Sequence, residues 1–294
     1  MDAGSCDCRF TVRAQVQIVA ELGSNHDGSL GQAMALADAV IAAGADVVKL
    51  QDHRGQDVLG ARHPKWMHPA AVNAESRHDY IVRTCFAPHE WGCISAHVRA
   101  RGALFSVSPF TVEALADQLR AQRLDIIKIA SGQITNEPLL RLARDSGLPV
   151  HVSCGMTSSE ETMQALSLGG EGWFSGAPGR AGPLTILHCT SEYPCSPDHV
   201  NVRRVSVPWA VSSDVGFSDH TLGVAASLAA ITLGAQVIER HVGWDRRAYS
   251  SDSQHSLTID EFAAFVREAR CLERMLRSGR PDLRAVREAF LCRR

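Results

Sequence analysis

The sequence predicts a single-domain α/β protein with the (β/α)8 TIM-barrel fold. Short runs rich in valine and isoleucine alternate with segments of helical spacing almost to the end of the 294-residue chain. Such alternation is typical of a parallel sheet, and eight β/α units over residues 15–276 match a closed barrel. Polar residues also follow nearly every expected strand. A barrel gathers these residues on one face, whereas the competing doubly wound sheet gives no reason for them.

The strands are predicted from apolar runs that end at polar or turn residues. They are expected at 15–21, 46–50, 103–107, 125–129, 148–153, 184–188, 209–212 and 236–240. The helices are predicted from apolar residues three and four positions apart. They are expected at 29–43, 88–101, 111–121, 136–146, 158–168, 221–233 and 259–276.

The remaining segments are interpreted as caps, loops and ends. Ser29 and Ser158 are expected to cap helices, with Glu161 completing a capping box beside Ser158. Two stretches with prolines, 54–80 and 170–183, are expected to be long loops. Residues 1–14 are interpreted as an N-terminal extension and 277–294 as a C-terminal helical tail.

The composition excludes several classes of function. A net charge of −2 gives no basic surface for nucleic acid, and no apolar run is long enough to span a bilayer. The N-terminus has no signal-peptide pattern, so a cytoplasmic protein is expected. The nine cysteines are then free thiols in a reducing compartment.

Lysine is rare in this chain, and two of the lysines end apolar strands. Arginine supplies most of the 30 basic residues, and lysine occurs only at Lys49, Lys65 and Lys128. Lys49 and Lys128 close the runs 46–50 and 125–129, where a barrel keeps its reactive groups. The alternative is that their stems only extend from the strand ends into water.

Hydroxyl groups accompany the two lysines at the other strand ends. Two cations with serine and backbone N–H groups form a suitable site for a ligand that carries a phosphate and a carboxylate. The hydroxyl residues include Ser106, Ser108, Ser131, Ser153, Thr190, Ser191, Tyr193 and Ser218.

Two histidines end adjacent strand units and are candidates for a metal site. His220 and His241 could bring their imidazoles together at the carboxyl face of the barrel. Two neutral imidazoles with open positions suit a borderline divalent ion such as Mn²⁺, Fe²⁺ or Zn²⁺.

Several segments together resemble the sialic acid (N-acetylneuraminate) synthase family, which joins phosphoenolpyruvate to an N-acetylated aldose. They run in the family's order from residue 17 to about residue 255. They are AELGSNHDGS from Ala20, GADVVKLQ from Gly44, KIASGQITN from Lys128, SCGM from Ser153, HCTSEYP from His188, GFSDHTLG from Gly216 and VIERH from Val237.

The resemblance implies a transferase that forms a carbon–carbon bond, and it implies a role for each matching residue. His220 and His241 match the ligands of a divalent metal, Mn²⁺ first, with Mg²⁺ or Co²⁺ possible. Glu21 matches an acidic residue near the sugar carbonyl, with Gln51 beside it, and Asp252 matches a carboxylate that holds sugar hydroxyls. The residues that match the phosphoenolpyruvate site are Lys49, Ser108, Lys128, Ser131, Ser153, Ser191, Tyr193 and Ser218.

The resemblance also implies a mechanism. The metal polarises the aldehyde, C3 of phosphoenolpyruvate attacks it, water adds at C2, and phosphate leaves by C–O cleavage. A 3-deoxy-2-ulosonic acid results, and a homodimer of barrels is expected.

The chain departs from the family pattern at the acceptor end. The family's C-terminal antifreeze-like domain, whose arginine reaches the sugar of a partner's site, is expected to be absent. Arg246 and Arg247 could take over that contact. Ser108 and Cys154 stand where threonine is usual, and the loop 245–255 lacks a Gly-Pro pair. Two alternatives therefore stay open: condensation with a different aldehyde, or a non-catalytic barrel that partners a separate antifreeze-like chain.

Overall fold

Eight parallel strands close into a barrel in the computed structural model, which describes residues 15–54, 75–168, 182–207 and 214–278. The barrel closes where β1 pairs with β8, with Gln17 opposite Val237 and Glu21 opposite His241. A short ninth strand, β9, adds to the end of β8. The strands are β1 Gln17–Gly23, β2 Val47–Asp52, β3 Leu104–Pro109, β4 Ile126–Ile129, β5 Val150–Ser153, β6 Leu184–His188, β7 Asp214–Asp219, β8 Val237–Gly243 and β9 Leu257–Thr258.

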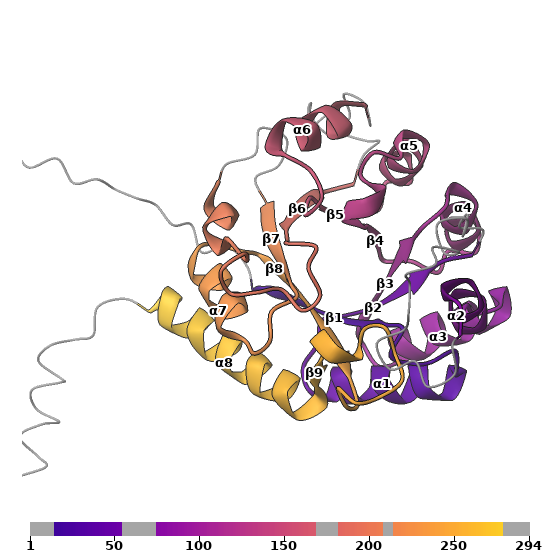
Figure 1. The fold of residues 1–294 in the computed structure, drawn as a ribbon, viewed down its shortest axis with the longest axis horizontal. Coiled ribbons are helices and arrows are strands. Elements are labelled where there is room, and N and C mark those ends of the chain that lie inside the picture. The colour runs from indigo at the N-terminus through magenta and orange to yellow at the C-terminus, as the bar shows by residue number, and fades with distance from the viewer. Residues whose placement is uncertain (1–14, 55–74, 169–181, 208–213, 279–294) are drawn as a thin grey trace, which may run out of the picture.

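The helices surround the strands as an outer ring, which Figure 1 shows from one end of the barrel. They are α1 Leu30–Ala42, α2 Arg77–Thr84, α3 Pro88–Ala100, α4 Val112–Arg120, α5 Glu137–Asp145, α6 Ser159–Leu168, α7 Ala225–Thr232 and α8 Ile259–Arg277. The described residues between β6 and β7 contain a 3₁₀ helix, Val202–Ser206, in place of an α-helix. These elements confirm the predicted (β/α)8 barrel.

The interior of the barrel is built in two layers because side chains alternate along each strand. The lower layer is an apolar cluster whose members on β1, β2, β4 and β8 precede the charged residues of those strands. Its members are Val19, Val47, Ile126, Leu187 and Val237. Two residues further along β1, β2, β4 and β8, the same face carries Glu21, Lys49, Lys128 and Glu239. The apolar layer therefore closes the bottom of the barrel and leaves the charged layer facing its carboxyl end.

Most predicted elements agree with the structure to within two or three residues, and the two predicted caps are confirmed. Ser29 accepts from the Gln32 backbone N–H, and Ser158 accepts from the Glu161 N–H while that glutamate accepts from the Ser158 N–H. The strand expected at 209–212 lies outside the described residues, and β7 follows it at 214–219.

One loop prediction was wrong in part. The stretch 54–80 was expected to be irregular, but its last four residues, 77–80, begin α2. Its two prolines and three histidines obscured the start signal, which is the N-cap Ser76 accepting from the Asp79 N–H at 3.1 Å. Residues 55–74 lie outside the described part, as do the predicted N-terminal extension and residues 279–294 of the predicted tail. Within the described ranges, no helix has the length and apolar character needed to cross a membrane.

Candidate active site

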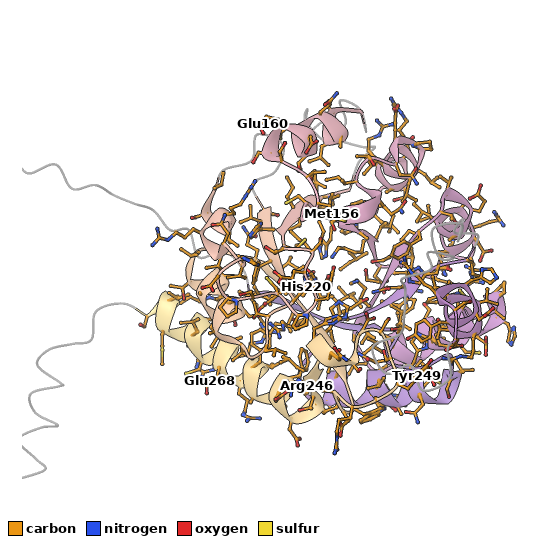
Figure 2. The ribbon with its side chains drawn as sticks, in the orientation of Figure 1. Met156, Glu160, His220, Arg246, Tyr249 and Glu268 are labelled. Atoms are coloured by element: carbon orange, nitrogen blue, oxygen red, sulfur yellow. The ribbon has the colours of Figure 1, made fainter. Side chains whose placement is uncertain are left out.

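A cavity of about 540 Å³ opens at the carboxyl ends of the strands. The side chains of the predicted site converge on this cavity, and Figure 2 shows one of them, His220, near the centre of the ring of helices. The predicted residues that line it are Lys49, Gln51, Ser108, Lys128, Ser131, Ser153, Ser191, Tyr193, Ser218, His220, His241 and Asp252. Glu21, the remaining predicted residue, is fully buried in the charged layer beside Lys49.

The floor of the cavity is a buried network of two lysines and two carboxylates. Lys49 Nζ lies 2.5 Å from Glu21 Oε2 and 3.7 Å from Glu239 Oε2. Lys128 Nζ donates to both oxygens of Glu239 at 2.7 Å. Unpaired charges at this depth would cost several kcal/mol each, so the pairing keeps all four groups compatible with burial. Lys49 and Lys128, which the sequence predicts to bind an anionic ligand, are therefore neutralised by carboxylates of the protein itself.

Burial and the neighbouring charges shift the pKa values of these groups in different directions. Burial raises the pKa of Glu21, with Lys49 opposing the rise and the charge of Glu239 adding to it. Burial acts against the charged form of Glu239 as well, but Lys128 and Lys49 outweigh it and lower the pKa of that carboxyl. Burial lowers the pKa of Lys128, an effect that Glu239 opposes. Of the two carboxylates, Glu21 is therefore the better placed to carry a proton.

The predicted hydroxyl groups surround the two lysines. Ser108 Oγ accepts from Lys49 Nζ at 3.2 Å, and Ser218 Oγ donates to Glu239 Oε1 at 2.8 Å. Ser131 and Ser191 face each other with 2.9 Å between their oxygens. With Ser153 on β5, these serines come from five different strand ends. They can therefore give several hydrogen bonds to one small anion.

A second group of side chains orients Glu21 from the mouth of the cavity. Gln51 Nε2 donates to Glu21 Oε1 at 2.7 Å, and the Gln51 carbonyl lies 2.9 Å from His53 Nε2. The imidazole of His53 stacks on Phe110 with 4.0 Å between ring centroids. Gln51 therefore lies beside Glu21, as the resemblance implies.

The histidine side of the cavity holds three imidazoles rather than two. The His220 and His241 rings lie 5.6 Å apart between centroids, and His255 lies 4.5 Å from His241. His220 Nδ1 donates to the Thr190 carbonyl at 2.9 Å, which directs its Nε2 the other way. Burial lowers the pKa of His220 to about 4 and that of His241 well below its usual value. Neutral imidazoles of this kind are metal ligands, so the residues present fit a divalent ion.

Sequence reasoning missed two residues of the site and gave no role to a third. Glu239, two positions before His241 on β8, is expected among the polar residues at the strand ends, but the sequence did not indicate that it pairs with the lysines. Arg77, the first residue of α2, lines the cavity, but its helix had been interpreted as loop. His255 belongs to a loop that had been singled out without assigning this residue.

The two arginines expected near the acceptor lie elsewhere. Arg246 pairs with Glu261 at 2.5 Å, and Arg247 pairs with Asp245 at 2.6 Å while its side chain is 89% exposed. Neither is among the residues that line the cavity. Figure 2 shows Arg246 toward the rim of the barrel, away from the central His220.

Buried neutral histidines should make the fold sensitive to acid. Burial lowers the pKa of His26 and of His151 to about 4, against about 6.5 in the unfolded chain. Between these values the unfolded chain binds more protons, so stability falls as pH drops from about 6.5 toward 4. At pH 5 each of these histidines should lower the free energy of unfolding by about 2 kcal/mol relative to its value at neutral pH. Urea unfolding at pH 7 and pH 5 measures this loss.

A pair of variants isolates the contribution of one histidine. Between pH 7 and pH 5, the free energy of unfolding of His26→Gln should fall by about 2 kcal/mol less than that of the unchanged chain. His199→Gln is the control, because that imidazole lies on the surface beside Glu192, which raises its pKa. An equal loss in both variants would show that His26 is not held neutral in the fold.

Comparison with known proteins identifies the family of this chain. Residues 36–281 match the model of the NeuB family. The chain is 32% identical over 265 residues to the N,N'-diacetyllegionaminic acid synthase of Campylobacter jejuni, covering 89% of this chain and 78% of that protein. It is 32% identical over 279 residues to the pseudaminic acid synthase of the same species, covering 93% of this chain and 78% of that protein.

A solved structure gives the same fold over nearly its whole length. The N-acetylneuraminic acid (sialic acid) synthetase of Leptospira borgpetersenii, crystallised with citrate, superposes with a TM-score of 0.76 at 27% identity. The match covers 95% of this chain and 91% of that one. With the matched residues, the barrel and the cavity taken together, this chain belongs to the NeuB family.

Proposed function

We propose that this chain condenses phosphoenolpyruvate with an aldose, such as an N-acyl amino sugar, to give a 3-deoxy-2-ulosonic acid and phosphate. Membership of the NeuB family makes it a carbon–carbon bond-forming transferase of the N-acetylneuraminate synthase type. The observation that carries the proposal is one cavity lined by two buried lysines and a ring of serines on one side and three imidazoles on the other.

The lysine side is proposed to bind phosphoenolpyruvate. Its phosphate and carboxylate can replace the carboxylates of Glu21 and Glu239 as partners of Lys49 and Lys128, or share those lysines with them. Serine hydroxyls complete the anion's hydrogen bonds beside the two lysines. This preorganised charge also favours the negative charge that develops on the departing phosphate.

The histidine side is proposed to hold the aldehyde. A divalent ion bound there would polarise the carbonyl, and Mn²⁺ is the ion first expected, with Mg²⁺ or Co²⁺ possible. C3 of phosphoenolpyruvate then attacks the carbonyl carbon, and water adds at C2 before phosphate leaves with the bridging oxygen. Glu21, whose pKa is raised by burial, is placed to give or take the proton that this sequence requires.

The acceptor end of the cavity carries a cation that the sequence had not indicated. Arg77 is exposed at the start of α2 and lines the cavity together with Tyr80 and Asp252. Within the described part of the chain it makes no hydrogen bond or ion pair. The neighbouring carboxylates have other partners: Glu75 pairs with Arg83 at 2.9 Å, and Asp79 accepts from the Ser76 hydroxyl at 2.6 Å. Arg77 is therefore available to bind an acyl oxygen or an anionic group of the acceptor.

Replacing Arg77 by alanine should raise the KM for the acceptor about tenfold, because a hydrogen bond to a charged group is worth about 1.5 kcal/mol. The KM for phosphoenolpyruvate should stay unchanged. Arg141→Ala is the matched control, since Arg141 pairs with Glu137 on the outside of α5. An unchanged acceptor KM in Arg77→Ala would remove Arg77 from the acceptor site.

The acceptor is identified by phosphate release over a panel of aldoses in the presence of phosphoenolpyruvate and metal. We expect N-acyl amino sugars to give the highest kcat/KM, and turnover with N-acetylmannosamine at the rate of the best acceptor would mark an ordinary sialic acid synthase. Preference for another aldehyde would support the alternative, in which the chain condenses phosphoenolpyruvate with a different aldehyde. A homodimer and a cytoplasmic location remain predictions, which light scattering and fractionation test.

A further inference from the structure

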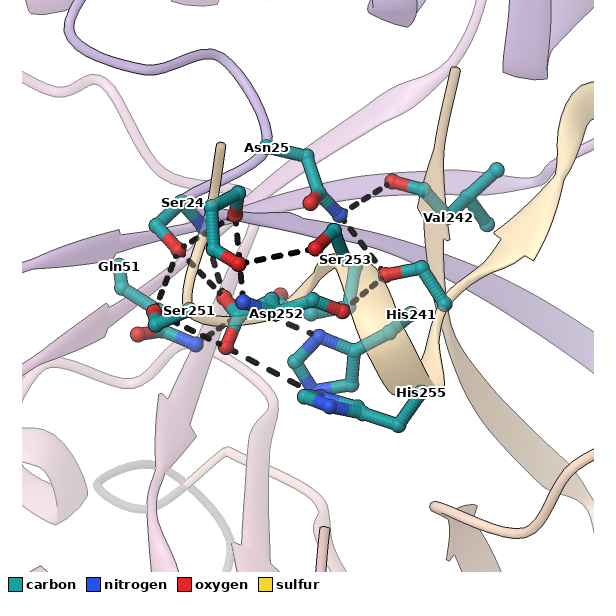
Figure 3. Close-up of polar contacts among 12 residues, drawn as sticks. Ser24, Asn25, Gln51, His241, Val242, Ser251, Asp252, Ser253 and His255 are labelled. Atoms are coloured by element: carbon teal, nitrogen blue, oxygen red, sulfur yellow. Dashed lines mark hydrogen bonds and ion pairs between the residues drawn. The ribbon is translucent and has the colours of Figure 1, made fainter. Parts of the chain in front are cut away.

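His255 lies among the groups that could bind a metal, although no motif pointed to it. It is buried with 3% of its surface exposed, and its ring centroid lies 4.5 Å from that of His241 and 6.2 Å from that of His220. The imidazole reaches the cavity from the 3₁₀ helix Ser253–His255, just after Asp252 (Figure 3). The segment that follows β8 therefore brings a third imidazole and a carboxylate close to His241.

The facing nitrogens of two of these imidazoles are buried and have no hydrogen-bond partner among the described residues. They are Nδ1 of His241 and Nε2 of His255. Each lies 3.9 Å from an oxygen of Asp252, the first from Oδ2 and the second from Oδ1. These separations are too long for hydrogen bonds but suit two ligands that share an ion at about 2.1 Å each. One ligand atom from each of His241, Asp252 and His255 lies within 4.8 Å of the others.

The surroundings hold Asp252 in place for such a role. Asp252 Oδ2 accepts from the Ser24 backbone N–H at 2.8 Å and from the Ser24 hydroxyl at 3.0 Å, as the dashed lines of Figure 3 show. A Cβ at Gly23 would lie 2.1 Å from that same oxygen and 3.3 Å from His241 Nδ1, so only glycine leaves room there. Hydrogen bonds that fix a ligating carboxylate are a regular feature of metal centres.

We propose that His255 is a metal ligand and that it forms, with His241 and Asp252, a two-histidine, one-carboxylate centre bordered by His220. This set of donors with open positions favours borderline ions such as Fe²⁺, Co²⁺ or Zn²⁺ over the hard ion Mg²⁺. The inference deepens the proposed function, since it changes the ligand set that the resemblance implies and moves Asp252 from the sugar to the metal. Metal binding can nevertheless be measured without any substrate.

The test is Co²⁺ titration of the metal-free full chain, followed through the visible absorption of the bound ion. We expect one Co²⁺ per chain, and a loss of affinity of about 100-fold or more in His255→Ala, because even groups that only support a ligand are worth 10–100-fold. A large excess of Mg²⁺ should not displace the Co²⁺. His97→Ala is the control, since that imidazole lies 2.8 Å from Asp38 on the outer surface of the barrel.

A second variant keeps the test decisive if His255→Ala does not fold. His255→Cys should bind Co²⁺ and add a sulfur-to-metal charge-transfer band, which appears only if residue 255 touches the ion. Unchanged Co²⁺ affinity in a folded His255→Ala, or a His255→Cys spectrum without that band, would overturn the proposal and leave His255 as a packing partner of His241. Failure of the proposed function would instead show as normal Co²⁺ binding without turnover.

Discussion

Replacing Lys128 by alanine is expected to weaken phosphoenolpyruvate binding by roughly 2–4 kcal/mol, or about 30-fold to 700-fold. Lys128 is 2% exposed and donates to both oxygens of Glu239. Without Lys128, Glu239 loses its principal partner and keeps only the longer contact with Lys49. Its negative charge then lies at the place where the anion must bind. Calorimetric titration with phosphoenolpyruvate measures the loss.

Two further variants show whether charge or shape causes the effect. Lys128→Arg keeps the charge but should restore binding poorly, because a planar guanidinium does not fit a site built around a compact ammonium group. Lys128→Ala combined with Glu239→Gln removes the uncompensated carboxylate and should recover part of the affinity. Unchanged phosphoenolpyruvate affinity in a folded Lys128→Ala would remove this lysine from the anion site.

Replacing His241 by alanine is expected to lower kcat by about a thousandfold or more while phosphoenolpyruvate still binds. A metal that polarises a carbonyl is worth several kcal/mol of transition-state stabilisation, and His241 lies between the other two imidazoles of the site. Treatment of the unchanged chain with a chelator should give the same loss, which Mn²⁺ or Co²⁺ should reverse. His97→Ala should retain full activity, and a loss of less than about tenfold in His241→Ala would rule out a metal-dependent step through this residue.

The fold could be predicted from sequence because its signals are local and repeated. Each apolar run ends where polar residues begin, and the period of two then assigns Val47 and Lys49 to the same inner face. The one helix that was missed, α2, follows a stretch whose prolines and histidines carry no helical spacing. Its position became evident only with the N-cap at Ser76.

The candidate site could be predicted as a set of residues but not as a set of partners. Strand ends brought Lys49, Lys128 and the serines together because a barrel gathers strand ends on one face. The sequence could not show that Glu239 already neutralises Lys128, since the two residues are 111 positions apart. His255 escaped for a similar reason: a loop residue has no periodicity, and only the folded loop places its nitrogen opposite His241.

The measurement that tests the account most directly is product stoichiometry with the purified chain, a divalent metal ion, an N-acyl amino sugar and phosphoenolpyruvate labelled with ¹⁸O at its bridging oxygen. The account predicts equal amounts of phosphate and 3-deoxy-2-ulosonic acid, with the label in the phosphate. A folded, metal-loaded chain that consumes no phosphoenolpyruvate with any aldose, or releases phosphate without forming the ulosonic acid, would contradict it.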